Sequence, residues 1–327
     1  MSDSNDELMM ETMYWWGIPT LFRCEHNKDL SKCDIALAGV PHSTGNGTTE
    51  RDQHLGPRAV RHVSAGLRRV HLDFNINPWK KKKIFDLGDV ALPHANNNEK
   101  CIEDITNFYK KIAKEKKPVV SIGGDHSITG GILQGLGSEN LKMTKGKKIS
   151  FLHIDAHTDT FSQLDHFMGA KKSAAHWGSY LVEQGIIDPK TSMQIGMRGN
   201  PRTLDWLQPS YDLGYNVVTM EEFKKRGIDD VVKETLDKVG DNPIYITFDL
   251  DSLDSSVAPA VSNIEPSFTG FTIDEAKALI QSVKNKNVIG GDVVCLMPTK
   301  DQKNNITSMV AASIMFEIIS VIAYKSK

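Results

Sequence analysis

Short apolar runs alternate along the chain with longer segments in which apolar residues recur every three or four positions. The short runs are rich in β-branched residues and predict buried strands, whereas the longer segments predict helices. Strands are expected at residues 33–40, 117–124, 148–155, 192–199, 215–220, 243–251 and 287–296. Helices are expected near residues 100–116, 127–136, 176–185, 220–239, 272–285 and 305–323.

This alternation predicts an α/β fold. Strands that are apolar along their whole length are buried on both faces, and the helices between them connect the strands of a parallel sheet. We expect a single three-layer αβα domain with a central, mostly parallel sheet over residues 14–327, preceded by a flexible N-terminal arm over residues 1–13. Ligands of such sheets bind at the carboxyl ends of the strands.

Charge and composition narrow the classes of partner. A formal net charge of −2 gives no overall attraction to nucleic acid or to anionic membranes. The basic run Lys80–Lys83 is expected to be a solvated turn before a strand. No uninterrupted apolar stretch approaches the ~18 residues that span a bilayer, the N-terminus is unlike a signal peptide, and the cysteines form no CxxC pair. We therefore expect a cytoplasmic protein with neither nucleic-acid nor membrane partners.

Polar residues gather where three of the predicted strands end. The segments are "GGDHS" (123–127), "HIDAHTD" (153–159) and "FDLDSLD" (248–254). Residues two apart in a strand face the same side, so Asp249 and Asp251 are expected to point together, and the second segment repeats this spacing. Six side chains are expected to meet at one edge of the sheet: His126, Asp155, His157, Asp159, Asp249 and Asp251.

Four neighbouring carboxylates cannot all stay charged unless cations neutralise them. Two divalent metal ions would do so, and a ligand set of carboxylates with two imidazoles suits Mn²⁺, Co²⁺ or Ni²⁺. The alternative, a salt-bridge or helix-capping network, requires basic residues near these segments, and none is close in sequence. Two such ions would lower the pKa of a bridging water and provide hydroxide near neutral pH.

In this order, the three segments resemble the metal-binding signatures of the ureohydrolases, the family of arginase, agmatinase and the guanidino-acid hydrolases. The resemblance runs from about residue 14 to the C-terminus, and "WGIPTLFR" (16–23) is similar to the N-terminal segment of agmatinase-type members. It implies an arginase-like fold, the six residues above as ligands of two Mn²⁺-type ions, and hydrolysis of agmatine, a guanidino acid or a small guanidine to urea and an amine. It also implies a homo-oligomer, a trimer or hexamer.

Proton transfer is expected from Asp159 and from a histidine beyond the second segment. Family members carry this histidine in a His-Gly-Thr segment, and here His176 falls slightly later, with His166 as the second candidate. His176 could instead cap the helix that follows it. Three further residues are expected to lie behind the ligands and to orient them: His153, Asp125 and Asp254.

The chain departs from the family where substrate binds. The family pattern Asp-x-x-Glu-x-x-Pro, whose glutamate holds the guanidinium, reads "DVVCLMP" (292–298) here, so Cys295 occupies the glutamate position. A neutral thiol cannot replace a carboxylate as a guanidinium acceptor. The loop "APAVSNIEP" (258–266) replaces a glycine-rich family loop and places Glu265 where substrate would enter.

Several interpretations therefore stay open. Glu265 could supply the missing charge, the substrate could be an amidine or imino compound without a full guanidinium, or the chain could be a catalytically silent partner subunit. Arginase activity itself is disfavoured, because "TFSQLDHFMGAKK" (160–172) lacks the residues that hold an α-amino acid in arginases. The aromatic "YWWG" (14–17) could line the pocket or form an oligomer contact.

Overall fold

The computed structural model describes residues 5, 8–9, 12–47, 51–137, 142–164, 167, 169–265 and 269–325. Over these residues the central layer is a nine-stranded sheet in the order β1-β3-β2-β4-β9-β8-β5-β6-β7, and every neighbouring pair is parallel. The strands are β1 (Glu25–His26), β2 (Ile35–Val40), β3 (Ile84–Asp89), β4 (Val119–Gly123), β5 (Ser150–Ile154), β6 (Met193–Met197), β7 (Asn216–Thr219), β8 (Pro243–Asp249) and β9 (Asn287–Val294).

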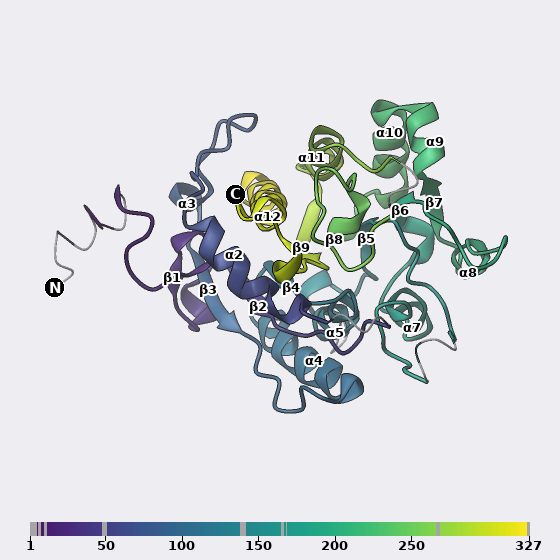
Figure 1. Ribbon diagram of the computed structural model, residues 1–327, viewed down its shortest axis with the longest axis horizontal. Helices are drawn as coiled ribbons and strands as arrows, with labels where there is room; N and C mark the ends of the chain where they lie inside the picture. The colour runs from purple at the N-terminus through teal and green to yellow at the C-terminus, as the bar shows by residue number, and fades with distance from the viewer. Residues whose placement is uncertain are drawn as a thin grey trace.

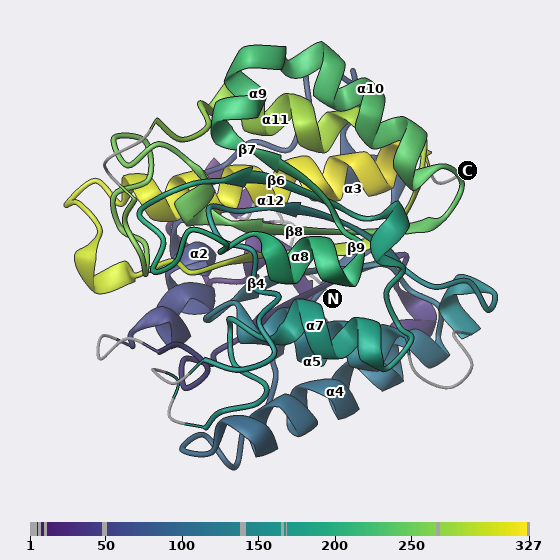
Figure 2. The same cartoon turned by 90° about the vertical axis from the view of Figure 1, so that its right-hand side faces the viewer.

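Helices cover both faces of the sheet, which confirms the predicted three-layer α/β fold (Figures 1 and 2). One layer contains α2 (Gly56–Ser64), α3 (Pro78–Lys81), α9 (Met220–Arg226), α10 (Ile228–Val239), α11 (Ile273–Ser282) and α12 (Ile306–Lys325). The other contains α4 (Asn98–Lys114), α5 (Ser127–Leu136), α7 (Trp177–Glu183) and α8 (Gln208–Leu213). Two apolar cores therefore lie on either side of the sheet.

The expected elements are present with three local differences. The predicted helix 220–239 is two helices, because Gly227 has φ 83 between α9 and α10. The basic run before β3 is partly the short helix α3 rather than a turn. The strand predicted over 243–251 ends at Asp249, where a 3₁₀ turn (Leu250–Ser252) begins.

The C-terminal helix α12 is long and apolar enough to cross a membrane by length and composition, the one such helix among the described residues. However, 72% of its apolar window is buried inside the fold. It packs against β9, α2 and α11, so it belongs to the helical layer on one face of the sheet (Figure 2).

The strand order explains why the polar segments meet. β4, β9, β8 and β5 are consecutive in the sheet, and because they are parallel, their carboxyl ends lie at the same edge. The last residue of β8 and the segments that follow β4, β5 and β8 carry all six predicted ligands, and the segment after β9 carries Cys295. The sheet therefore brings four distant parts of the chain to one place.

Candidate metal centre and substrate pocket

The loop after β5 turns three predicted ligands toward one another. Asp155 accepts a hydrogen bond from the backbone N–H of His157 at 2.7 Å. Asp159 has φ 52, a left-handed conformation that aspartate tolerates better than most residues. The indole Nε1 of Trp177 donates to Asp159 Oδ2 at 3.0 Å. Backbone and side-chain hydrogen bonds thus hold both carboxylates in place.

Asp249 and Asp251 converge in a different way from the one predicted. Because β8 ends at Asp249, the two residues do not share a strand face. Instead, Asp249 Oδ1 accepts from the N–H of Asp251 at 2.9 Å and folds the chain into the 3₁₀ turn. The buried guanidinium of Arg198 donates to the carbonyls of Asp251 and Leu253, at 2.7 and 3.0 Å, and holds the turn in place.

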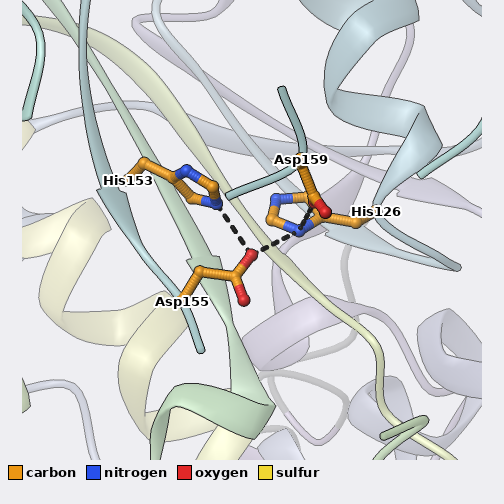
Figure 3. A group of neighbouring side chains, drawn as sticks. All are labelled: His126, His153, Asp155 and Asp159. Atoms are coloured by element: carbon orange, nitrogen blue, oxygen red, sulfur yellow. Dashed lines mark hydrogen bonds and ion pairs between the residues drawn. The ribbon is translucent and has the colours of Figure 1, made fainter. Parts of the chain in front are cut away.

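The first group of ligand atoms surrounds His126 (Figure 3). His126 Nδ1 lies 2.9 Å from Asp155 Oδ2, 2.9 Å from Asp159 Oδ2 and 3.2 Å from Asp249 Oδ2. All four side chains are buried. Nevertheless, Nδ1 makes no well-directed hydrogen bond. A buried nitrogen that faces three carboxylates without a hydrogen bond fits a site for a cation.

A second group shares Asp155 with the first. His157 Nδ1 lies 3.4 Å from Asp155 Oδ1 and 3.3 Å from Asp251 Oδ2. Asp251 Oδ2 is buried and has no hydrogen-bond partner. Because Asp155 offers one oxygen to each group, the two groups form a pair of adjoining sites bridged by one carboxylate.

The pKa values of His126, His157 and Asp251 show that the clustered carboxylates strongly favour a positive charge beside them. Burial disfavours the charged form of His126, yet the surrounding carboxylates hold its pKa well above the ordinary value. Burial has the same effect on His157, and Asp251 and its neighbours likewise raise its pKa. Burial and the charge of Asp249 raise the pKa of Asp251. Metal ions displace protons from such groups when they bind, so the donor set fits two divalent cations.

His153 lies behind Asp155 and donates a hydrogen bond to it, rather than offering a ring lone pair to a metal ion. Gln194 Nε2 donates to the carbonyl of Thr158 at 2.6 Å and lies 3.2 Å from His153 Nδ1. His153 Nδ1 is therefore the acceptor, and Nε2 carries the proton that it donates to Asp155 Oδ2 at 2.7 Å. This geometry supports the orienting role predicted for His153.

The other two residues expected behind the ligands hold loops instead. Asp125 accepts hydrogen bonds from the N–H of Gly45 and from Ser127. Asp254 accepts from the N–H of Ser256 and of Gly270. None of these hydrogen bonds reaches a predicted ligand, so the geometry gives both aspartates a role in loop structure.

A cavity of about 540 Å³ opens over the ligand groups. His126, His157, Asp159 and Asp249 line its inner end. The described residues that form its remaining walls come mainly from loops: Asn46, Thr158, Phe161, Leu164, Phe167, Ala174, Ala175, Asn200, Pro201, Arg202, Thr203, Trp206, Asn263, Glu265 and Cys295.

Glu265 reaches the cavity as predicted. Its loop runs antiparallel to the segment after β9, with a bridge between Val261 and Leu296. Its Oε1 lies 3.1 Å from His157 Nε2. Gly199, at φ 106, leaves room for this carboxylate, since a side chain there would collide with it. The loop that differs from the family pattern therefore places an acidic group beside the predicted metal ligands.

Cys295 also lines the cavity, as a neutral thiol. It is buried and has φ 70, a left-handed conformation. Burial and the charges of Asp249 and Asp251 raise the pKa of its thiol well above the ordinary value. Among the described residues of the cavity wall, and leaving aside the predicted metal ligands, Glu265 is thus the acidic residue available to bind a guanidinium.

His176 does not line the cavity, although Ala174 and Ala175 do. Its ring is buried, and Nδ1 lies 2.5 Å from Ser173 Oγ. It occupies the N-cap position of α7, but its side chain makes no capping hydrogen bond. The structure therefore does not support the capping role, and the proton-transfer role of His176 stays a prediction. His166 lies outside the described residues.

Sequence reasoning missed the polar residues that hold the ligands. Four of them lie inside an apolar strand or directly after one, and the fifth begins helix α7: Gln194, Arg198, Thr247, Asp292 and Trp177. The available signal was a polar side chain within a buried strand, which is costly unless it is hydrogen-bonded. The exposed Tyr14, Trp15 and Trp16 are not part of the cavity wall, so their interpretation as a pocket wall is not supported.

Comparisons of the sequence and fold with known proteins identify the family of this chain. The arginase-family model matches residues 33–320. The chain is 31% identical over 309 residues to guanidinopropionase of Pseudomonas aeruginosa, covering 94% of this chain and 92% of that protein. It is 32% identical over 303 residues to the mitochondrial guanidino acid hydrolase of Homo sapiens, covering 93% and 82%.

Among solved structures, proclavaminate amidino hydrolase of Streptomyces clavuligerus superposes with a TM-score of 0.86 at 27% identity, covering 96% of this chain and all of that one. An arginase from Bacillus subtilis, at 22% identity and a TM-score of 0.68, shares the fold. Both the family match and the relatives span nearly the whole chain. The protein therefore belongs to the arginase family.

Proposed function

We propose that the protein is a metal-dependent hydrolase that converts a guanidino compound to urea and an amine. The observation that carries this proposal is the pair of adjoining ligand groups, bridged by Asp155, at the inner end of a cavity that also contains Glu265. The relatives named guanidinopropionase and guanidino acid hydrolase support the reaction class.

The cofactor would be two divalent metal ions. His126, Asp155, Asp159 and Asp249 would hold one ion, and Asp155, His157 and Asp251 the other. Bound there, the ions would lower the pKa of a bound water and so supply the hydroxide that attacks the guanidinium carbon. We propose Mn²⁺, with Ni²⁺ or Co²⁺ as alternatives, because the donors are carboxylates and imidazoles without thiolates.

The chain's own groups would bind and orient the substrate. Glu265 accepts charge-assisted hydrogen bonds from the guanidinium in place of the family glutamate. Asp159, which lines the cavity, would carry a proton to the departing nitrogen. Phe161, Phe167 and Trp206 provide apolar walls that limit access of bulk water.

The outer cavity favours a substrate with a negative tail. Arg202 lines this wall and is exposed. Its charge attracts the carboxylate of a guanidino acid and repels the ammonium of agmatine. We therefore expect kcat/KM to be higher for guanidino acids than for agmatine. The difference should be at most about fivefold, because an exposed ion pair contributes up to about 1 kcal/mol.

A substrate panel tests the proposal. Metal-loaded protein is assayed for urea, formamide and ammonia with 3-guanidinopropionate, 4-guanidinobutyrate, agmatine, guanidine and a formimino compound. Urea from a guanidino compound is the expected product. Release of formamide or ammonia from the formimino compound alone would favour the amidine or imino alternative, and no product from any compound would favour a silent subunit. In Arg202→Ala, the preference for guanidino acids over agmatine should fall.

Assembly and location remain predictions. A trimer or hexamer would cover apolar side chains of the N-terminal segment, where Trp15 and Ile18 are 68% and 88% exposed. This segment projects away from the body of the protein (Figure 1). The cytoplasmic location is proposed from composition alone.

A further inference from the structure

A buried chain of polar groups runs from the ligand His126 away from the cavity. His126 Nε2 lies 2.9 Å from Thr247 Oγ1 in β8. Thr247 Oγ1 donates to Asp292 Oδ1 in β9 at 2.7 Å. The two residues meet because they are register partners of adjacent parallel strands. All three side chains are buried, so water does not satisfy these groups.

Among the described side chains around Asp292, the groups that donate hydrogen bonds to its carboxylate are all hydroxyls. Besides Thr247, the donors are Tyr245, at 2.8 Å, and Thr129, at 2.9 Å, both to Oδ2. Burial raises the pKa of Asp292, and these hydrogen bonds oppose that rise by stabilising the carboxylate. A carboxylate only accepts, so each hydroxyl directs its one proton toward Asp292.

This arrangement determines which nitrogen of His126 carries the hydrogen. Thr247 has donated its only proton, so its oxygen can only accept from His126 Nε2. In the neutral imidazole the lone pair is then on Nδ1. That atom faces Asp155, Asp159 and Asp249 and lacks a directed hydrogen bond.

We infer that Asp292 is a positioning residue of the metal centre: acting through Thr247, it sets the tautomer of His126 that presents the Nδ1 lone pair to a metal ion. The inference rests on the proposed function in one respect: both require metal ions to bind at these groups. Partners behind a metal-binding histidine orient the ring and strengthen binding by about 10- to 100-fold.

Asp292→Asn tests this relay. The carboxamide can donate to Thr247, which frees the Thr247 proton for His126 Nε2 and moves the imidazole hydrogen to Nδ1. We expect the affinity for Mn²⁺ in the His126 group to fall by about 10- to 100-fold. At limiting Mn²⁺, the stoichiometry should drop from two ions per chain to one. Calorimetric titration with Mn²⁺ alone and elemental analysis measure both quantities.

Two variants serve as controls. Thr247→Ser keeps the hydroxyl and should bind two Mn²⁺ ions with unchanged affinity. Thr129→Val removes one donor to Asp292 and the 3.3 Å contact between Thr129 Oγ1 and Thr247 Oγ1, but it leaves the hydrogen bonds that link Asp292, Thr247 and His126, so it should also bind both ions. A merely structural role would lower the Tm of the metal-free protein, whereas the relay predicts a smaller rise in Tm on addition of Mn²⁺.

If Asp292→Asn fails to fold, Thr247→Val is measured instead and should lose the same ion. Two Mn²⁺ ions bound with wild-type affinity in the folded variant would overturn the inference and leave the proposed function intact. Conversely, two ions in the wild type without hydrolysis of any guanidino compound would refute the proposed function and leave the relay standing. A wild type without Mn²⁺ would overturn both.

Discussion

Asp155→Ala is expected to lose both metal ions and turnover together. Asp155 contributes one oxygen to each ligand group, and no other side chain does so among the described residues. Metal ions contribute several kcal/mol to stabilisation of the transition state, and each 1.4 kcal/mol corresponds to tenfold in rate, so kcat/KM should fall by roughly 10³-fold or more. Elemental analysis of the purified variant and a urea assay check both effects.

The matched control is Asp254→Asn. Asp254 is also an aspartate of the third polar segment, but it bonds only to its own loop, and asparagine keeps the acceptor for Ser256. This variant should retain two ions and most activity. If Asp155→Ala bound two ions, or if Asp254→Asn lost them equally, the ligand groups would be assigned incorrectly.

Glu265→Gln is expected to lower kcat/KM for guanidino substrates by about 10- to 100-fold, because a hydrogen bond to a charged group contributes about 1.5–3 kcal/mol. Glutamine retains an oxygen that can accept from His157 Nε2, so metal content should not change. The measurement is steady-state urea release at saturating metal, with elemental analysis of the same samples.

Relocating the charge provides the complementary test. Cys295→Glu in the Glu265→Gln background restores a carboxylate at the family position, on the same cavity wall. Partial recovery of kcat/KM would support recognition of the guanidinium by Glu265. Unchanged activity in Glu265→Gln alone would show instead that another group holds the guanidinium.

The sequence was sufficient to predict where the candidate site lies. Apolar strands that alternate with helices specify a parallel sheet, and in such a sheet all carboxyl ends meet at one edge. Polar residues at three strand ends were therefore expected to converge, and the structure brings them together. Glu265 was likewise identified because its loop departs from the family pattern.

The sequence was not sufficient where local hydrogen bonds compete with regular structure. Period-two spacing placed Asp251 on the strand, but the side chain of Asp249 captures the N–H of Asp251 and ends the strand there. The direction of His176 depends on Ser173 and on the ring of Phe167, which no periodicity reveals. Asp292 and Thr247 were hidden because their partnership depends on strand register, which only the folded sheet defines.

Anomalous diffraction from crystals of the Mn²⁺-loaded protein tests the central claim most directly. We predict two manganese peaks, one among His126 Nδ1, Asp155, Asp159 and Asp249 and the other among Asp155, His157 and Asp251. Peaks elsewhere, or an active protein with no manganese or other metal at these groups, would contradict the account.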